Sequence, residues 1–148
     1  TKLFVDPMVA RGHGRIINIA SIVSFFPTPN FAAYGASKAY VLSLSEALSQ
    51  ELRGTGVTAT AVCPGYTKTD MISGAVEDAG LHSMDKMVPA AFQMDAMTVA
   101  REGYRKAMQG RALHINGIHN QVAAEWVRYQ PRWLIRNAGG MVSRLLNR

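Results

Sequence analysis

The sequence has little cysteine, no long apolar run and few acidic residues in its last third. Its 148 residues contain one cysteine, Cys63, so an internal disulfide is excluded and nothing favours an oxidising compartment. No run approaches the roughly 18 apolar residues that a membrane-spanning helix needs, and the N-terminus has no signal-peptide pattern. We therefore expect a cytoplasmic protein, or one attached peripherally to a membrane.

The scarcity of acidic residues is local. Residues 1–100 carry seven Lys or Arg against eight Asp or Glu, whereas residues 101–148 carry nine against two. The net charge of +6 therefore comes from the C-terminal third. Residues 1–100 are not basic, which argues against a nucleic-acid surface there. We expect no nucleic-acid partner. The four histidines have no metal-ligand spacing with one another or with carboxylates, so no metal is expected.

Hydrophobic periodicity predicts strands that alternate with helices. Short β-branched or apolar runs predict strands over 15–20, 57–62 and 113–115, and helical periodicity predicts helices over 31–53 and 96–109. We expect the first strand to be buried on both faces. This order of elements is typical of an α/β fold with a parallel sheet and right-handed crossovers.

The ends of the predicted helices carry recognisable signals. Asn30 and Asp95 are the predicted N-caps, and Gly54 or Gly56 is the predicted end of the first helix. The second helix has an apolar stripe that consists of Met97, Ala100, Tyr104, Ala107 and Met108. Beyond residue 119 we expect an amphipathic helix broken at Pro131 and at Gly139-Gly140.

Residues that could bind a ligand or transfer a proton lie near the predicted carboxyl ends of the strands, where parallel α/β sheets bind ligands. Ser21 follows the first strand, Pro64-Gly65 follows the second, and Tyr34 and Lys38 lie in the first turns of the intervening helix. Residues at i and i+4 share a helix face, and a nearby cation lowers the pKa of a phenol. A tyrosine tuned in this way can exchange a proton near neutral pH.

Three segments resemble the short-chain dehydrogenase/reductase family: Gly-Arg-Ile-Ile-Asn-Ile-Ala-Ser, Tyr-Gly-Ala-Ser-Lys and Pro-Gly-Tyr-Thr-Lys-Thr-Asp, all within residues 14–71. Ser21 precedes Tyr34 by thirteen residues, which is the family's spacing. The resemblance implies a Rossmann-like doubly wound parallel sheet, present here as its C-terminal half with about three strands. It also implies an NAD(P)-dependent oxidoreductase that interconverts a carbonyl and an alcohol.

The resemblance also implies roles for individual residues. Tyr34 would be the general acid/base, Lys38 would lower its pKa and bind the nicotinamide ribose, and Ser21 would hold the substrate oxygen. The cofactor-binding residues implied by the family pattern are Ile19, Tyr34, Lys38, Pro64, Gly65, Thr67 and Thr69.

The matched part lacks the family's first βα units. No Gly-x-Gly-x-x-Gly spacing occurs, and the residue that chooses between NAD and NADP has no counterpart, so the cofactor is NAD or NADP. By this resemblance we expect the chain to open inside the helix before the family's fifth strand, after roughly 100 residues of βα units. We expect residues 1–118 to form a catalytic half and residues 119–148 a basic amphipathic C-terminal helical extension.

Two functions stay open. The first is an oxidoreductase that acts on a small-molecule carbonyl or alcohol. The methionines of 71–97 and the basic tail favour a hydrophobic or lipid-like substrate. The alternative is a catalytically silent truncated fragment, a dimerisation or binding module that pairs through the helix 31–53. The resemblance implies a homodimer or homotetramer that forms through that helix. For residues 126–148, packing of the apolar face on its own domain is favoured over contact with a membrane surface.

Overall fold

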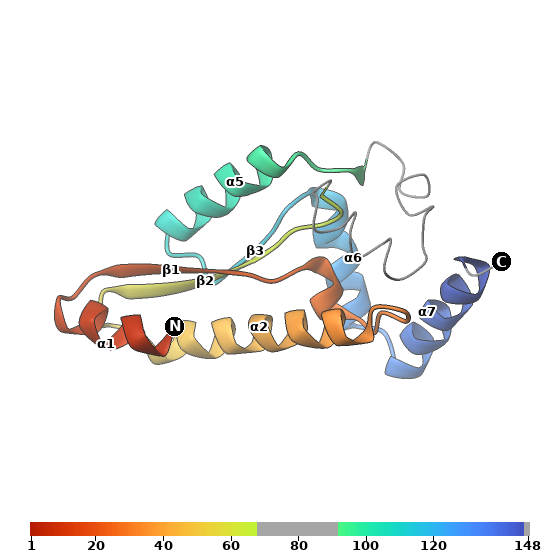
Figure 1. The fold of residues 1–148 in the computed structure, drawn as a ribbon, viewed down its shortest axis with the longest axis horizontal. Coiled ribbons are helices and arrows are strands. Elements are labelled where there is room, and N and C mark those ends of the chain that lie inside the picture. Colours follow the sequence, from red (N-terminus) through yellow and green to blue (C-terminus); the bar gives the residue numbers. More distant parts are fainter. Residues whose placement is uncertain (68–91, 147–148) are drawn as a thin grey trace.

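Three parallel strands form the centre of the fold (Figure 1). The computed structural model describes residues 1–67 and 92–146. Strands β1 (Gly14–Ile19), β2 (Val57–Cys63) and β3 (Leu113–Ile115) lie side by side in sequence order. Both pairings are parallel, and a helix lies between each pair in the sequence. The structure confirms the predicted three-stranded parallel α/β sheet.

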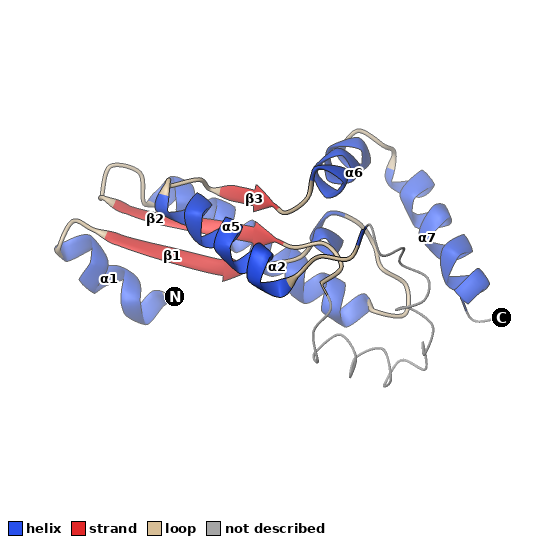
Figure 2. Ribbon diagram, turned by 90° about the horizontal axis from the view of Figure 1, so that it is seen from above, coloured by secondary structure: helices blue, strands red, loops and turns tan. Residues whose placement is uncertain are grey.

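Helices lie on both faces of this sheet. α1 (Lys2–Ala10) and α2 (Ala32–Glu51) lie on one face, and α5 (Ala96–Met108) lies across the other (Figure 2). α6 (Ile118–Arg128) follows β3, and α7 (Arg132–Leu146) extends beyond the end of the sheet (Figure 1). Over the part of the chain that the structure describes, no helix combines the length and apolarity needed to cross a membrane.

The core lies between the sheet and α2. Alternate residues of β2 are almost fully buried there: Val57, Ala59, Ala61 and Cys63. Leu42 of α2 and Leu52, the residue that follows α2, pack on them because the period of a strand directs every second side chain to the same face. A polar pair also lies on this face, where the half-buried Asn18 donates through Nδ2 to Oγ of the buried Ser45 at 2.9 Å.

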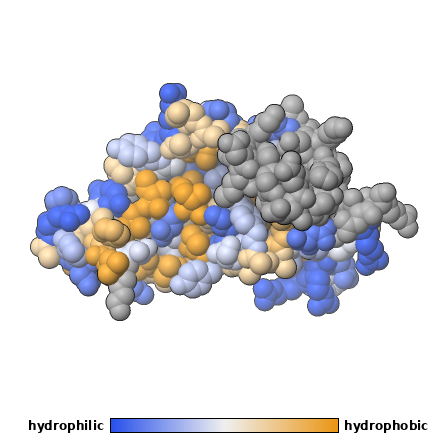
Figure 3. Space-filling model, viewed as in Figure 1, coloured by the Kyte–Doolittle hydropathy of each residue, from blue (hydrophilic) through white to orange (hydrophobic). Residues whose placement is uncertain are grey.

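The opposite face of the sheet is only partly covered. Gly103 of α5 packs directly over Val62, and Thr60 is buried with its hydroxyl donating to the carbonyl of Arg111 at 2.6 Å. On β1, however, Ile17 is 37% and Ile19 54% exposed. Apolar residues gather between α5 and β1 in Figure 3. The prediction that the first strand is buried on both faces is therefore wrong, because α5 alone leaves these side chains open.

The apolar stripe predicted on α5 is mostly not its buried face. The helix buries Val99, Gly103 and Ala107, whereas Met97 and Tyr104 are more than half exposed. The reason is the glycine, because a helix can approach a strand most closely where it has no side chain.

The helix ends follow the sequence in part. Asp95 caps α5 as predicted, with its Oδ2 accepting from Thr98 N at 2.8 Å. Asn30 does not cap α2: it takes a left-handed conformation with φ 69°, and the N-cap is Phe31. α2 ends at Glu51, a turn before the predicted glycines.

Gly56 is required by the turn that leads into β2. Its φ is +78°, and a Cβ at this position would collide with the carbonyl oxygen of Gly12. A side chain is therefore excluded by conformation and by space.

The C-terminal helices differ from prediction in two respects. The break at Pro131 is confirmed, but α7 continues through Gly139-Gly140. Gly139 lies against Pro29 in the loop before α2, so the glycine provides space where α7 contacts this loop and does not end the helix. Packing of the apolar face is incomplete: Leu134 and Ile135 are half-buried, while three aromatic residues are more than half exposed, namely Trp126, Tyr129 and Trp133.

Candidate active site

The segments that follow β1 and β2 remain paired beyond the ends of the strands. Ala20 N donates to Val62 O at 2.8 Å, and Ile22 N donates to Pro64 O at 2.9 Å. Ser21 therefore lies beside the Pro64-Gly65 turn, as expected for two parallel strands that end at the same edge. The structure brings these two predicted segments together.

Ser21 is held in place by a short helix. It is the N-cap of the 3₁₀ helix η1 (Ile22–Phe25), and its Oγ accepts from Val23 N at 3.4 Å. Ser24 Oγ accepts in return from Ser21 N at 3.3 Å. A hydroxyl also has one hydrogen to donate, and no other described residue accepts it. Ser21 is thus fixed through its oxygen and keeps its own donor.

Tyr34 and Lys38 come together on the first two turns of α2. Lys38 Nζ donates to the carbonyl of Ile19 at 3.0 Å and lies 5.6 Å from the centroid of the Tyr34 ring. Both side chains are half-buried. An ammonium within about 6 Å of an aromatic face is attracted to it. The contact with Ile19 uses one of the three ammonium hydrogens, which leaves two for a ligand.

The turn after β2 is packed against the start of α6. Gly65 has no side chain, and the amide of Asn120 occupies the space that a Cβ would need. Asn120 Nδ2 donates to Asn116 O at 2.8 Å, and the hydroxyl of Thr67 donates to Gly65 O at 3.1 Å. Thr67 is buried, whereas the predicted Thr69 lies outside the described residues.

Sequence reasoning missed the two asparagines at this edge. Asn116 follows β3 directly, and Asn120 lies four residues later on the first turn of α6. The sequence indicates their place only through their position after the third predicted strand. Because β3 is parallel to β2, its carboxyl end must reach the same edge of the sheet.

A polar cluster links α5 to the end of β3. The fully buried Asn116 donates through Nδ2 to Glu102 Oε2 at 2.9 Å, and His114 Nε2 lies 3.6 Å from the same oxygen. Burial lowers the pKa of His114, and the hydrogen bond and charge of Glu102 act in the opposite direction. Because burial prevails, the His114 imidazole is neutral at pH 7.

The comparisons with known proteins agree with this geometry. A family model for the short chain dehydrogenase matches residues 1–80. A short-chain type dehydrogenase/reductase of Picea abies is 44% identical over 82 residues, which are 55% of this chain and 30% of the relative. The 3-oxoacyl-[acyl-carrier-protein] reductase FabG of Rickettsia typhi is 31% identical over 118 residues, covering 76% of this chain and 49% of the relative.

A solved structure gives the same picture. A short-chain dehydrogenase from Sphingobium yanoikuyae in complex with NADPH superimposes with a TM-score of 0.64 at 30% identity, over 93% of this chain and 48% of that one. The chain belongs to the short-chain dehydrogenase family. It spans half or less of the length of these relatives.

The residues present fit one end of a nicotinamide cofactor. Lys38 keeps two ammonium hydrogens for a ligand at the carboxyl end of β1, and the hydroxyl of Thr67 holds the Gly65 turn at the same edge of the sheet. These groups suit a ribose and a carboxamide. The sequence has no Gly-rich turn before a helix that would bind a pyrophosphate.

Proposed function

We propose that this protein is an NAD(P)-dependent oxidoreductase that interconverts a carbonyl and an alcohol, with Tyr34 as its general acid/base. The observation that carries the proposal is the position of the Lys38 ammonium, held by the carbonyl of Ile19 and lying over the Tyr34 ring. Membership of the family supports the reaction class. NAD or NADP, when bound, supplies or accepts the hydride.

The chain's own residues handle the proton and the substrate oxygen. During reduction Tyr34 donates its phenolic proton to the carbonyl oxygen, and during oxidation it removes the proton of the alcohol. Lys38 favours the phenolate by its positive charge. Ser21 donates its free hydroxyl hydrogen to the substrate oxygen, where negative charge develops.

The cofactor contacts follow from the same edge of the sheet. Lys38 would bind the ribose, and the segment from Pro64 through Gly65 and Thr67 to Thr69 would line the nicotinamide, with Ile19 beneath it. The NADPH complex of the Sphingobium protein supports a nicotinamide cofactor without deciding between NAD and NADP.

A hydrophobic substrate fits the surroundings of Ser21. The four residues after Ser21 include Ile22, Val23 and Phe25, all half-buried. A substrate whose oxygen reaches Ser21 therefore meets apolar side chains next. The name of the Rickettsia reductase, which specifies an acyl substrate, supports the same class.

We also propose that the protein forms a homodimer or homotetramer through the helix 31–53. Tyr40, in the middle of α2, is more than half exposed and is available for such a contact. Residues 119–148 would be a helical extension of the catalytic half, since α6 begins where β3 and its turn end. A cytoplasmic location, with or without peripheral membrane contact, completes the proposal.

Substitution of Tyr34 tests the proposal. Tyr34→Phe removes the proton donor but keeps the ring beside Lys38, so we expect kcat to fall about 10²–10⁴-fold. The assay follows NADH and NADPH absorbance with a panel of hydrophobic ketones, and the melting temperature checks that the fold is intact.

Tyr40→Phe is the matched control, since Tyr40 lies on the same helix away from Lys38, and we expect its activity to be unchanged. Turnover by Tyr34→Phe within tenfold of the parent would contradict the role of Tyr34. A parent protein without turnover, and without a rise in melting temperature on adding either cofactor, would favour the silent binding module instead.

A further inference from the structure

A groove of about 590 Å³ lies between the start of α2 and the α6–α7 junction. Its volume falls in the range of pockets that hold small ligands, about 300–1,000 Å³. One wall is the segment 23–29, and another is the face of α2 that includes Ala36 and Ala39. Neither Tyr34 nor Lys38 lines the groove, so it is separate from the proton-transferring residues.

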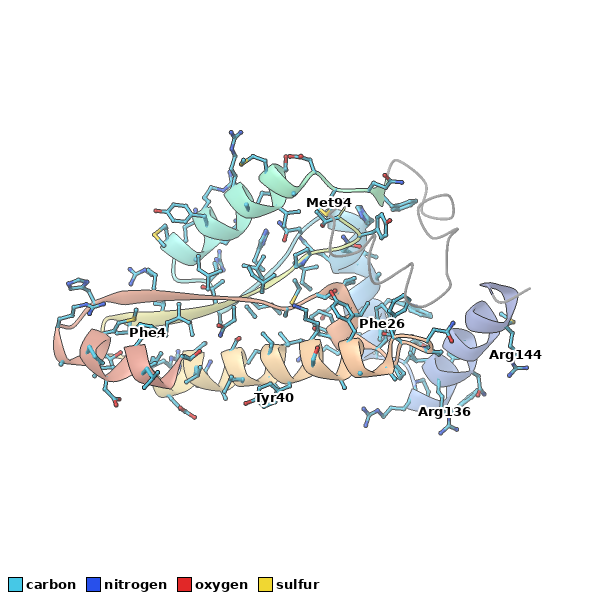
Figure 4. The ribbon with its side chains drawn as sticks, viewed as in Figure 1. Phe4, Phe26, Tyr40, Met94, Arg136 and Arg144 are labelled. Atoms are coloured by element: carbon cyan, nitrogen blue, oxygen red, sulfur yellow. The ribbon has the colours of Figure 1, made fainter. Side chains whose placement is uncertain are left out.

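The walls of the groove are mostly apolar. Phe25, Phe26 and Pro29 come from the loop, and Val127 and Ile135 come from α6 and α7. Phe26 lies at the end of α2 that faces these two helices (Figure 4). Binding of an apolar chain to such a surface is favourable, because the chain displaces water from apolar side chains.

The charged residues of the groove all have one sign. Arg128, in the last turn of α6, and Arg132, the first residue of α7, both line it, and no carboxylate does. Neither arginine makes an ion pair or side-chain hydrogen bond within the described ranges 1–67 and 92–146. Hydrophilic residues gather around α7 in Figure 3. Arg136 and Arg144 point away from the body of the protein (Figure 4), so they add positive charge nearby without filling the groove.

We propose that this groove binds a single-chain anionic amphiphile, a free fatty acid, with its acyl chain against the apolar wall and its carboxylate at Arg128 and Arg132. A guanidinium binds a carboxylate through two parallel hydrogen bonds, and the two unpaired guanidinium groups that line this groove give charge complementarity to that head group. The groove shares Val23 and Phe25 with the apolar surroundings of Ser21, but Ser21, Tyr34 and Lys38 do not line it, so the proposal does not rest on the hydride-transfer reaction.

A single chain fits better than a membrane surface. The exposed apolar residues of α6, such as Val122 and Trp126, share their face with Glu125, which accepts from Tyr129 Oη at 3.3 Å. A carboxylate on that face would be repelled by anionic lipid head groups. Glu125 does not line the groove, whereas Arg128 and Arg132 do.

Titration calorimetry with tetradecanoate below its micelle concentration tests the proposal. We expect one molecule to bind per chain, with dodecanoate weaker because each buried methylene contributes up to about fourfold in affinity. Tetradecanol keeps the chain but lacks the charge, and should bind at least about tenfold more weakly than tetradecanoate. Equal affinity for the alcohol, or no saturable binding, would overturn the proposal.

Two pairs of variants distinguish binding in the groove from effects of net charge or of a larger side chain on α2. The double variant Arg128→Gln, Arg132→Gln should lose about tenfold or more in affinity, whereas Arg101→Gln, Arg105→Gln on α5 removes equal charge and should have little effect. Ala36→Leu narrows the groove and should weaken binding, whereas Ala33→Leu, on the same helix outside the lining, should not.

The alternative occupant is tested in the same experiments. Binding to phosphatidylglycerol vesicles without binding of monomeric tetradecanoate would replace the proposal by a membrane contact. Because none of these readouts uses NAD(P) or turnover, loss of the proposed enzymatic activity and loss of fatty acid binding are observed independently.

Discussion

β2 meets a helix on each of its faces, yet the side chains that it presents to them differ. Toward α2 it presents Val57, Ala59, Ala61 and Cys63, which form two apolar clusters with leucines of the helix. Toward α5 it presents two threonines and Val62, and the contact depends on Gly103. One face is held by interlocking apolar side chains, and the other by close approach of backbone.

The difference shows where the stability of this chain resides. The α2 face also receives α1, so β1 is covered there through Ile16, Val5 and Met8. On the α5 face, β1 leaves Ile17 and Ile19 open. We expect substitutions on the α2 face to lower the free energy of unfolding far more than equivalent substitutions on the α5 face of β1.

The sharpest form of this comparison is a pair of truncations to alanine. Leu42→Ala opens a cavity in the buried cluster with Ala61 and Cys63, and should lower the free energy of unfolding by about 2–5 kcal/mol. Ile17→Ala removes a side chain that already contacts water, and should cost about 1 kcal/mol or less. Urea denaturation measures both. Equal costs would show that the α5 face is packed as tightly as the α2 face.

A larger residue at Gly103 tests the backbone contact on the α5 face. A Cβ there would lie 3.1 Å from both γ-methyl groups of Val62, so Gly103→Leu must push α5 away from the sheet. We expect a cost of about 1–3 kcal/mol, measured as a fall in the urea midpoint. Ala100→Leu, at an exposed position of the same helix, is the control and should be nearly neutral. A neutral Gly103→Leu would mean that α5 is not fixed by this contact.

The smallest expected effect is a pH dependence on the α5 side. Burial lowers the pKa of His114, so the unfolded chain takes up its proton at a higher pH than the folded one. The contribution of His114 to the free energy of unfolding is therefore fully present above about pH 6.5, and it is lost as the pH falls from that value through the lower pKa of the folded state. His114→Gln should reduce the loss of stability between pH 7 and pH 5. An unchanged slope would show that other groups account for it.

The sequence predicted the strands and the main helices to within a few residues because their signals are local. A β-branched run marks each of the first two strands, and the side chain of Asp95 caps α5 without help from distant residues. It was harder to predict which face of each helix is buried. The periodicity of α5 allows two apolar stripes, and only contact with Val62 selects the one that contains Gly103.

The candidate site shows the same limit. Ser21 and the Pro64-Gly65 turn could be placed together because both follow parallel strands, and the contact of Lys38 with Ile19 follows from the position of α2. Asn120 could not be predicted as part of this edge. Its place beside Gly65 depends on the path of the chain after β3, which no local pattern specifies.

Cys63 gives the central strand a built-in reporter. It is fully buried in β2, and burial raises the pKa of its thiol to about 12, with the charge of Glu46 acting in the same direction. At pH 8 the native sulfur is therefore neither ionised nor within reach of a thiol reagent. Because it is the one cysteine of the chain, the rate of its modification counts how often the middle of the sheet opens to solvent, without any introduced label.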